Sequence, residues 1–176
     1  MEAGELLRQA AWTARLCHPD REVVVAVDGV LPVRAAADAI LAVLGNLVDN
    51  AAKYSPRGEP IRMEASAAGD AVVLAVCDAG PGVPASERER IFQRYIQLDA
   101  GTANRAGGVG LGLHIARELA RAQGGDLVVA GADGPGQAAG GARFELRLPH
   151  VDPLAMVEPP PERPGRSAPA PVGASP

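Results

Sequence analysis

The chain has 176 residues and a formal net charge of −4, and it is 47% hydrophobic but only 3% aromatic. This length predicts one domain with at most an appendage, and the composition predicts a core of Ala, Val and Leu. The acidic balance argues against a nucleic-acid-binding protein, which is normally basic, although a single nucleotide can still bind at a locally positive site.

Cysteine usage and hydropathy bear on the compartment. Cys17 and Cys77 fit no metal-ligand spacing and indicate a reducing environment. The sequence contains neither a signal peptide nor an apolar run long enough to span a bilayer. We therefore expect a cytoplasmic segment that does not itself insert into a membrane, and a piece of a membrane-anchored parent would look the same.

The first half of the chain alternates between helical and extended patterns. Apolar residues at helical spacing predict helices over 2–16 and 38–54. Runs rich in β-branched residues predict strands over 22–28, 61–66 and 71–77. The last two strands flank an Ala-Gly-Asp turn, so we expect them to form an antiparallel hairpin.

The second half begins with a glycine-rich loop. The S-x-x-E spacing at 86–89 then predicts a capping box that opens a short helix through Phe92. Residues 98–110 carry few large apolar side chains and are predicted to be mobile when nothing is bound. A helix is predicted over 111–123, and its expected buried stripe is Leu113, Ile115, Ala116, Leu119 and Ala120.

Two more strands, over 126–130 and 142–148, complete the pattern, and the Pro-rich segment from residue 151 is predicted to be a disordered tail. Helices and hairpin-like strands that do not alternate strictly favour an α/β (α+β) two-layer sandwich. We expect helices on one face of a mixed, largely antiparallel sheet. A doubly wound parallel sheet is disfavoured because adjacent strands form hairpins.

The helix over 38–54 has an unusual polar stripe. Asn46, Asn50 and Lys53 share one side of a helix that is otherwise strongly apolar. Amide oxygens suit Mg²⁺ and an ammonium suits phosphate. On this helix alone, an ordinary solvated face explains the stripe equally well.

A carboxylate and two glycines come after the strand over 71–77. The pattern Asp78-x-Gly80-x-Gly82 lets a flat polar ligand approach the backbone closely, and Asp78 is suited to accept a hydrogen bond from an adenine amino group. Because Asp and Gly are also the commonest turn residues, this motif alone is a weak indication.

Glycines also precede the helix over 111–123. The segment GGVGLGL at 107–113 frees backbone N–H groups at a helix N-terminus, where an anion is favoured, and a flexible hinge is the alternative. A dinucleotide-binding fingerprint is excluded because the glycines do not come after the first strand, and no P-loop motif is present.

These motifs occur in an order that resembles one family. NLVDNAAKYSP at 46–56 resembles an N box, VCDAGPGVP at 76–84 a G1 box, RIFQRYIQ at 90–97 an F box, and GGVGLGLHIARELARAQGG at 107–125 a G2 box. Together they resemble the catalytic and ATP-binding domain of the sensor histidine kinases, in the superfamily shared with gyrase and MutL. The resemblance covers residues 4–149 and implies the Bergerat-type ATP-binding fold.

The resemblance implies roles for individual residues. Asn50 would bind Mg²⁺ that bridges the ATP phosphates, with Asn46 and Lys53 along the phosphate channel. Tyr54 would lie against the nucleotide and Asp78 would bind the adenine amino group. The remaining expected nucleotide-contacting residues are Gly80, Gly82, Gly108, Val109, Gly110, Leu111 and Gly112.

Other expectations concern the segment that resembles the F box and the lid after it. Phe92 would anchor this lid by packing. Arg105 is our first candidate for a lid cation at the γ-phosphate, with Arg94 behind it, because Gln97 stands where many members carry Arg. Val109 stands where many members carry Thr, so the side-chain hydroxyl is lost and the backbone N–H is kept.

The resemblance also implies partners. None of His18, His114 and His150 lies in the context expected of a phosphoacceptor, so the histidine that receives the phosphate would lie on a separate dimerisation domain. Residues 1–18 would be the end of a linker or dimerisation helix, 19–150 the ATP-binding catalytic domain and 151–176 the tail. A response regulator would be the next partner. His114 is expected to pack or hydrogen-bond rather than to catalyse.

Three alternatives remain within the superfamily. An ATP-hydrolysing clamp of the gyrase and MutL kind needs a Glu as general base where this chain has Asn46, and an amide is a poor base. An anti-sigma-factor-like serine kinase is disfavoured by the long segment before the G2 box. A non-catalytic nucleotide-sensing module is disfavoured by the intact set of Asn50, Asp78 and glycines.

Overall fold

The computed structural model describes residues 1–98, 109–130 and 141–151. Its helices are α1 (Ala3–Cys17), α2 (Ala37–Tyr54) and α3 (Gly112–Ala122). Its strands are β1 (Val23–Val27), β2 (Ile61–Ala68), β3 (Ala71–Cys77), β4 (Asp126–Val129) and β5 (Arg143–Pro149). Each of these described elements coincides with a segment predicted from the sequence, with ends that differ by at most two residues.

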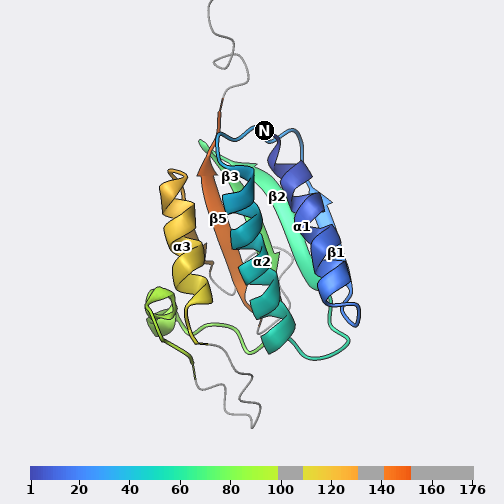
Figure 1. Cartoon of the computed structure of the whole chain (residues 1–176), viewed down its shortest axis with the longest axis vertical. Coiled ribbons are helices and arrows are strands. Elements are labelled where there is room, and N and C mark those ends of the chain that lie inside the picture. The colour runs from blue at the N-terminus through green and yellow to red at the C-terminus, as the bar shows by residue number, and fades with distance from the viewer. Residues whose placement is uncertain (99–108, 131–140, 152–176) are drawn as a thin grey trace, which may run out of the picture.

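The strands form a sheet in the order β1-β2-β3-β5-β4. β1 is parallel to β2, and the other neighbours are antiparallel. Helices α1, α2 and α3 lie side by side over one face of this sheet (Figure 1). The predicted two-layer sandwich with a mixed, largely antiparallel sheet is therefore confirmed.

The central helix α2 supplies much of the core between the two layers. Its apolar face is buried against the sheet, with Leu41 half-buried at the margin. The fully covered members of this face are Ile40, Val43, Leu44, Leu47, Val48 and Ala51. Burying this face against the sheet leaves the opposite side of α2, with the polar stripe, facing away from the core.

Helix α1 belongs to the same core. Its inner face is buried, and the carboxylate of Glu2 caps its N-terminus by accepting hydrogen bonds from the N–H groups of Gly4 and Glu5 at 3.0 and 2.7 Å. The expected origin of residues 1–18 in a linker or dimerisation helix stays a prediction, but the helix itself packs on the sheet with α2.

Two local expectations were wrong. Residues 85–92 form two short 3₁₀ turns, η1 (Ala85–Glu87) and η2 (Arg90–Phe92), and no side chain caps either one. Pro84, which has no polar side chain, occupies the cap position, so Ser86 falls inside the turn instead of before it. The capping box is thus absent from this described segment, and the predicted short helix takes the form of two 3₁₀ turns.

The second error concerns the buried stripe of α3. Ile115 is 47% exposed, whereas Arg117 is buried beside Ala116 and Ala120. α3 lies at the margin of the helical layer (Figure 1), so only a narrow stripe of it is covered. Arg117 can be buried because the carboxylates of Glu89 and Asp126 neutralise it.

The face of the sheet without helices carries a charged network. Arg143 on β5 donates hydrogen bonds to Glu64 on β2 and to Glu145, and Glu145 also accepts from Arg147. These long side chains lie over β3, where the small residues Ala75 and Cys77 are buried beneath them. Small residues on the central strand therefore allow charges from its two neighbours to meet.

Among the residues that the structure describes, no helix has the length and apolar content needed to cross a bilayer. The tail from residue 152, most of the segment predicted to be mobile over 98–110, and residues 131–140 lie outside the described residues.

Candidate functional site

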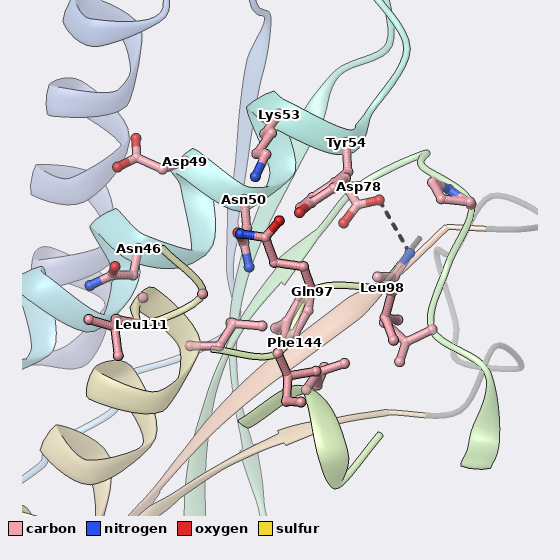
Figure 2. A pocket seen from close by; sticks show the side chains of 18 of the residues that line it. Asn46, Asp49, Asn50, Lys53, Tyr54, Asp78, Gln97, Leu98, Leu111 and Phe144 are labelled. Carbon is pink, nitrogen blue, oxygen red and sulfur yellow. Dashed lines mark hydrogen bonds between the residues drawn. The ribbon is translucent and has the colours of Figure 1, made fainter. Parts of the chain in front are cut away.

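A cavity of about 450 Å³ opens beside the C-terminal half of α2. Side chains from several distant stretches of the chain line it (Figure 2). Those of α2 and the β3–η1 loop are Asn46, Asp49, Asn50, Lys53, Tyr54, Asp78, Pro81, Gly82 and Val83. Those from the F-box region to β5 are Ile91, Ile96, Gln97, Leu98, Val109, Gly110, Leu111, Gly112, Leu113, Ala142 and Phe144.

The predicted polar stripe of α2 forms one wall of this cavity. Asn50 and Lys53 lie about one turn apart, and the Lys53 ammonium stands 4.8 Å from the centre of the Tyr54 ring. Asn46 donates its side-chain N–H to the carbonyl of Ala42 at 2.9 Å, which orients the amide. The wall therefore combines a cation with amide oxygens.

Asp78 lines the end of the cavity away from Asn46, and only 8% of the residue is exposed. Its Oδ1 accepts hydrogen bonds from the N–H groups of Gly80 and Ala142, at 2.7 and 3.4 Å. Burial raises the pKa of this carboxyl, although the two backbone hydrogen bonds oppose the change. Figure 2 shows Asp78 near Tyr54, with one of these hydrogen bonds as a dashed line.

Neighbouring glycines make this end of the site possible. A Cβ on Gly80 would lie 2.8 Å from Asp78 Oδ1 and 2.9 Å from the carbonyl oxygen of Tyr54. A Cβ on Gly141 would collide with the Asp78 carbonyl. Gly82 has φ +74°, which disfavours other residues. The loop can therefore approach both α2 and β5 only because these side chains are missing.

The opposite rim joins the F-box region to α3. The Tyr95 N–H donates to the Gly110 carbonyl at 2.9 Å, and both residues have positive φ, +64° and +70°. A Cβ on Gly110 would stand 2.9 Å from the Tyr95 carbonyl carbon. Val109, Leu111 and Gly112 line the cavity from here, whereas Gly108 and Arg105 lie outside the described residues.

Phe92 is buried under the guanidinium of Arg117, at 4.6 Å from the ring centre. Arg117 also donates to Glu89 at 2.7 Å and to Asp126 at 2.9 Å. The hydrogen bond from Arg117 lowers the pKa of Asp126. This arrangement fixes η2 against α3, and the expected anchoring of the lid by Phe92 stays a prediction.

His114 makes a second link between the same elements. Its Nδ1 lies 3.1 Å from the Phe92 carbonyl, and its Nε2 accepts a hydrogen bond from Arg94 Nε at 2.9 Å. The neutral ring with its proton on Nδ1 satisfies both bonds. His114 is thus a hydrogen-bonding residue, as expected, and Arg94 is held by it outside the cavity lining.

Sequence reasoning missed several lining residues. Ala142 and Phe144 come from β5 and the residue before it, more than sixty residues after Asp78, and only strand pairing brings them to the cavity. Asp49 was missed beside Asn50, and its carboxylate lies 2.9 Å from His18 Nε2. Arg117, which holds Phe92 without lining the cavity, had a usable signal, namely a charge on the apolar side of an amphipathic helix.

Comparison with known proteins places the chain in one family. Residues 35–152 match the family described as "Histidine kinase-, DNA gyrase B-, and HSP90-like ATPase". The sensor protein IrlS of Burkholderia pseudomallei is 42% identical over 106 residues, which are 60% of this chain and 23% of IrlS. The chain thus spans less than a quarter of the length of that relative.

Solved structures agree with this match. The mycobacterial sensor histidine kinase MprB superposes with a TM-score of 0.74 at 28% identity, covering 85% of this chain and 97% of that one. Full-length ShkA in complex with AMPPNP superposes with a TM-score of 0.69 at 30% identity, covering 86% of this chain and 30% of ShkA. The chain belongs to this family as a histidine-kinase-type catalytic and ATP-binding domain.

Proposed function

We propose that this domain binds ATP with Mg²⁺ and transfers the γ-phosphoryl group to a histidine on a separate dimerisation domain. The observation that carries the proposal is the pairing of a buried carboxylate, Asp78, with the stripe of Asn50 and Lys53 across one cavity. A purine fits the first end and an anion the second. The parent would act from the cytoplasm and pass the phosphoryl group on to a response regulator.

The adenine end is supported by the bonding of Asp78. Because Oδ1 is occupied by the N–H groups of Gly80 and Ala142, the carboxylate is held in one orientation. Among the described residues no hydrogen bond to Oδ2 is found, so this oxygen remains to accept from the exocyclic amino group. A guanine carbonyl at the same place would be an acceptor facing the acceptor oxygen of Asp78, and no hydrogen bond could form. The site is therefore selective for adenine.

The phosphate end is supported by charge and by backbone geometry. Lys53 supplies a cation, Asn46 lies along the same wall, and Tyr54 lines the cavity next to Lys53, where a bound nucleotide would contact its ring. The rim residues Gly110, Leu111 and Gly112 lead into the N-terminus of α3, where no side chain caps the helix. Its N–H groups and dipole favour an anion. Gly108 and Arg105 are proposed to contribute from outside the described residues.

The donor set fits Mg²⁺ when ATP is bound. Mg²⁺ prefers oxygen ligands and usually takes one or two from the protein, with substrate phosphates and water completing the shell. The amide oxygen of Asn50 is such a ligand, and the metal would neutralise charge on the transferring phosphoryl group. The chain's own residues then bind, orient and shield the triphosphate.

Phosphoryl transfer rather than hydrolysis is expected from Asn46. An amide cannot take a proton from water near pH 7, so we expect negligible steady-state hydrolysis of ATP by the domain alone. The serine-kinase alternative predicts a different product, because phosphoserine survives acid and phosphohistidine does not. The sensing-module alternative predicts nucleotide binding with no transfer.

One experiment separates these functions. The 176-residue chain is incubated with γ-labelled ATP, Mg²⁺ and a histidine-bearing dimerisation domain, and the labelled product is tested for acid lability. We expect acid-labile label on the added domain, and Asn50→Ala is expected to abolish the Mg²⁺-dependent transfer. Wild-type transfer rates in Asn50→Ala would rule out the metal role, and acid-stable label would favour the serine kinase.

A further inference from the structure

The segment between α1 and β1 makes a specific contact with the end of α2. The Arg21 guanidinium donates to the carbonyl of Ala52 at 2.7 Å, to that of Ser55 at 2.9 Å, and to that of Pro56. These three acceptors lie in the last turn of α2 and just beyond it. A single side chain that is distant in sequence therefore gathers the carbonyls at this helix end.

Such carbonyls need an external donor. The last four C=O groups of an α-helix have no intrahelical partner, and a cation there also complements the helix dipole. Within the part of the chain that the structure describes, Arg21 is the side chain found to donate to Ala52, Ser55 and Pro56. Its planar fork can serve several acceptors at once, which a lysine cannot do in the same geometry.

The turn held in this way carries residues of the nucleotide site. Lys53 lies between Ala52 and Ser55, two of the residues whose carbonyls accept from Arg21, and Asn50 precedes Ala52 by less than one turn. A second contact supports the same wall, because His18 Nε2 lies 2.9 Å from Asp49 Oδ1. The α1–β1 segment thus touches α2 on both sides of Asn50 along the sequence.

The adenine end is anchored differently. Asp78 is held by the N–H groups of Gly80 and Ala142, from its own loop and from the start of β5. Neither of these bonds involves Arg21. The two ends are joined by one contact, in which the Ala79 N–H of the Asp78 loop donates to the Ser55 hydroxyl at 3.3 Å. Because the hydrogen bonds of Asp78 itself do not involve Arg21, loss of Arg21 should affect the phosphate end of a bound nucleotide more than the adenine end.

We propose that Arg21 is a positioning residue that sets Lys53 and Asn50 for the triphosphate. This inference rests on the proposed function, since it assumes that Lys53 faces phosphate. Arg21 itself does not line the cavity, so its effect is transmitted through the backbone of the last turn of α2. Misplacing binding groups by a fraction of an ångström is enough to weaken a preorganised site.

The test compares two ligands in the whole 176-residue chain. Dissociation constants for ATP with Mg²⁺ are measured by calorimetry, and those for adenosine by NMR titration. We expect Arg21→Met to weaken ATP binding by roughly tenfold and adenosine binding by less than about twofold. Arg21→Gln, which keeps two donors, is expected to fall between wild type and Arg21→Met.

Two further variants make the result interpretable. Arg57→Met removes an exposed cation from the turn after α2, and Arg57 donates no hydrogen bond to the described residues, so its ATP affinity should equal that of wild type. Lys53→Met tests the proposed function itself and should weaken ATP binding with little change for adenosine. A general loss of folding would instead lower both affinities together and would appear as a lower melting temperature.

The outcomes are distinct. The positioning role is overturned if Lys53→Met loses ATP affinity while Arg21→Met binds ATP as wild type does. It is also overturned if Arg21→Met loses affinity for ATP and for adenosine by the same factor. In both cases the proposed function stands. If Lys53→Met binds ATP as wild type does, the phosphate role of Lys53 fails and the inference fails with it. Should Arg21→Met not fold, the ratio of the two affinities is decided in Arg21→Gln, where an unchanged ratio overturns the inference.

Discussion

The side chain of Asn46 occupies the space that a side chain on Gly112 would need. A Cβ built on Gly112 would stand 2.9 Å from Asn46 Oδ1, and the Asn46 amide is held in that orientation by its hydrogen bond to Ala42. The middle of α2 and the first residue of α3 therefore lie in close contact. These two helices line the phosphate end of the cavity, and this contact sets how closely they approach each other.

Gly112→Ala should disturb this contact. The new methyl group must push Asn46 out of its hydrogen bond or tilt the start of α3, and we expect ATP affinity to fall by about fivefold to twentyfold. Calorimetric titration with ATP and Mg²⁺ measures the change. Gly45→Ala is the matched control, because nothing lies within 4 Å of its Cβ position.

Gly45→Ala is expected to leave ATP affinity unchanged and to stabilise the chain by about 0.5–1 kcal/mol, because alanine is favoured over glycine inside a helix. Equal ATP affinities for Gly112→Ala and wild type would contradict the importance of the contact.

Adenosine affinity should depend on pH through Asp78. Burial raises the pKa of this carboxyl above its ordinary value of 3.8, and the ionised form is the one that accepts the amino N–H. Binding should therefore weaken as the pH falls through this raised pKa, at a higher pH than an ordinary aspartate would cause. Adenosine is the suitable ligand for NMR titration because it carries no titrating phosphate.

The raised pKa of Asp78 affects the stability of the fold with the opposite pH dependence to its effect on adenosine binding. A carboxyl with a raised pKa in the folded state contributes stability that is fully present below its unfolded pKa and is lost as the pH rises through the folded one. Asp78→Asn should remove both dependences and bind adenosine weakly at every pH. A wild-type adenosine titration that is flat with pH would refute the assignment of Asp78.

Glu145 should stabilise the charged network on the face of the sheet without helices at neutral pH. Burial works against its ionisation, but hydrogen bonds from Arg147 and Arg143 outweigh burial and lower its pKa below 4.5. Its side chain is 12% exposed. Glu145→Gln is therefore expected to lower the free energy of unfolding by about 1–3 kcal/mol at pH 7, measured by urea denaturation.

The pH dependence of this loss is set by the lowered pKa. The contribution of Glu145 is present above its unfolded pKa and disappears as the pH falls through the folded one, so the two proteins should converge in acid. Glu59→Gln, at an exposed position in the loop before β2, should match wild type throughout. A difference between Glu145→Gln and wild type that persists undiminished in acid would contradict the ionic origin.

Arg117→Met should loosen the F-box region from α3. The Arg117 side chain is 10% exposed, contacts Phe92 and pairs with Glu89 and Asp126. We expect a loss of about 1–3 kcal/mol in the free energy of unfolding, since the guanidinium covers Phe92 and neutralises Asp126.

Arg121→Met is the control for that change. Arg121 also reaches Asp126, at 3.2 Å, but its side chain is 52% exposed, so a loss below about 0.5 kcal/mol is expected. If both variants lose the same stability in thermal and urea denaturation, the buried position of Arg117 is not what matters.

The sequence alone determined the helices, the strands and the hairpin of β2 and β3, because hydrophobic periodicity and turn residues act locally. It also determined which residues could carry chemistry, since the order of Asn50, Asp78 and the glycines before α3 resembles one family. Local signals failed where they conflicted with context, as in the segment after Pro84, which forms 3₁₀ turns.

Only the tertiary structure decided what these residues meet. Pairing of β3 with β5 brings Ala142 to Asp78 and Phe144 to the cavity, and packing of α1 on the sheet brings Arg21 to the end of α2. Such contacts join residues that lie tens of positions apart, so no local pattern encodes them. The polar stripe of α2 can be found in the sequence, but the supports that hold it in place come from the packing of distant elements.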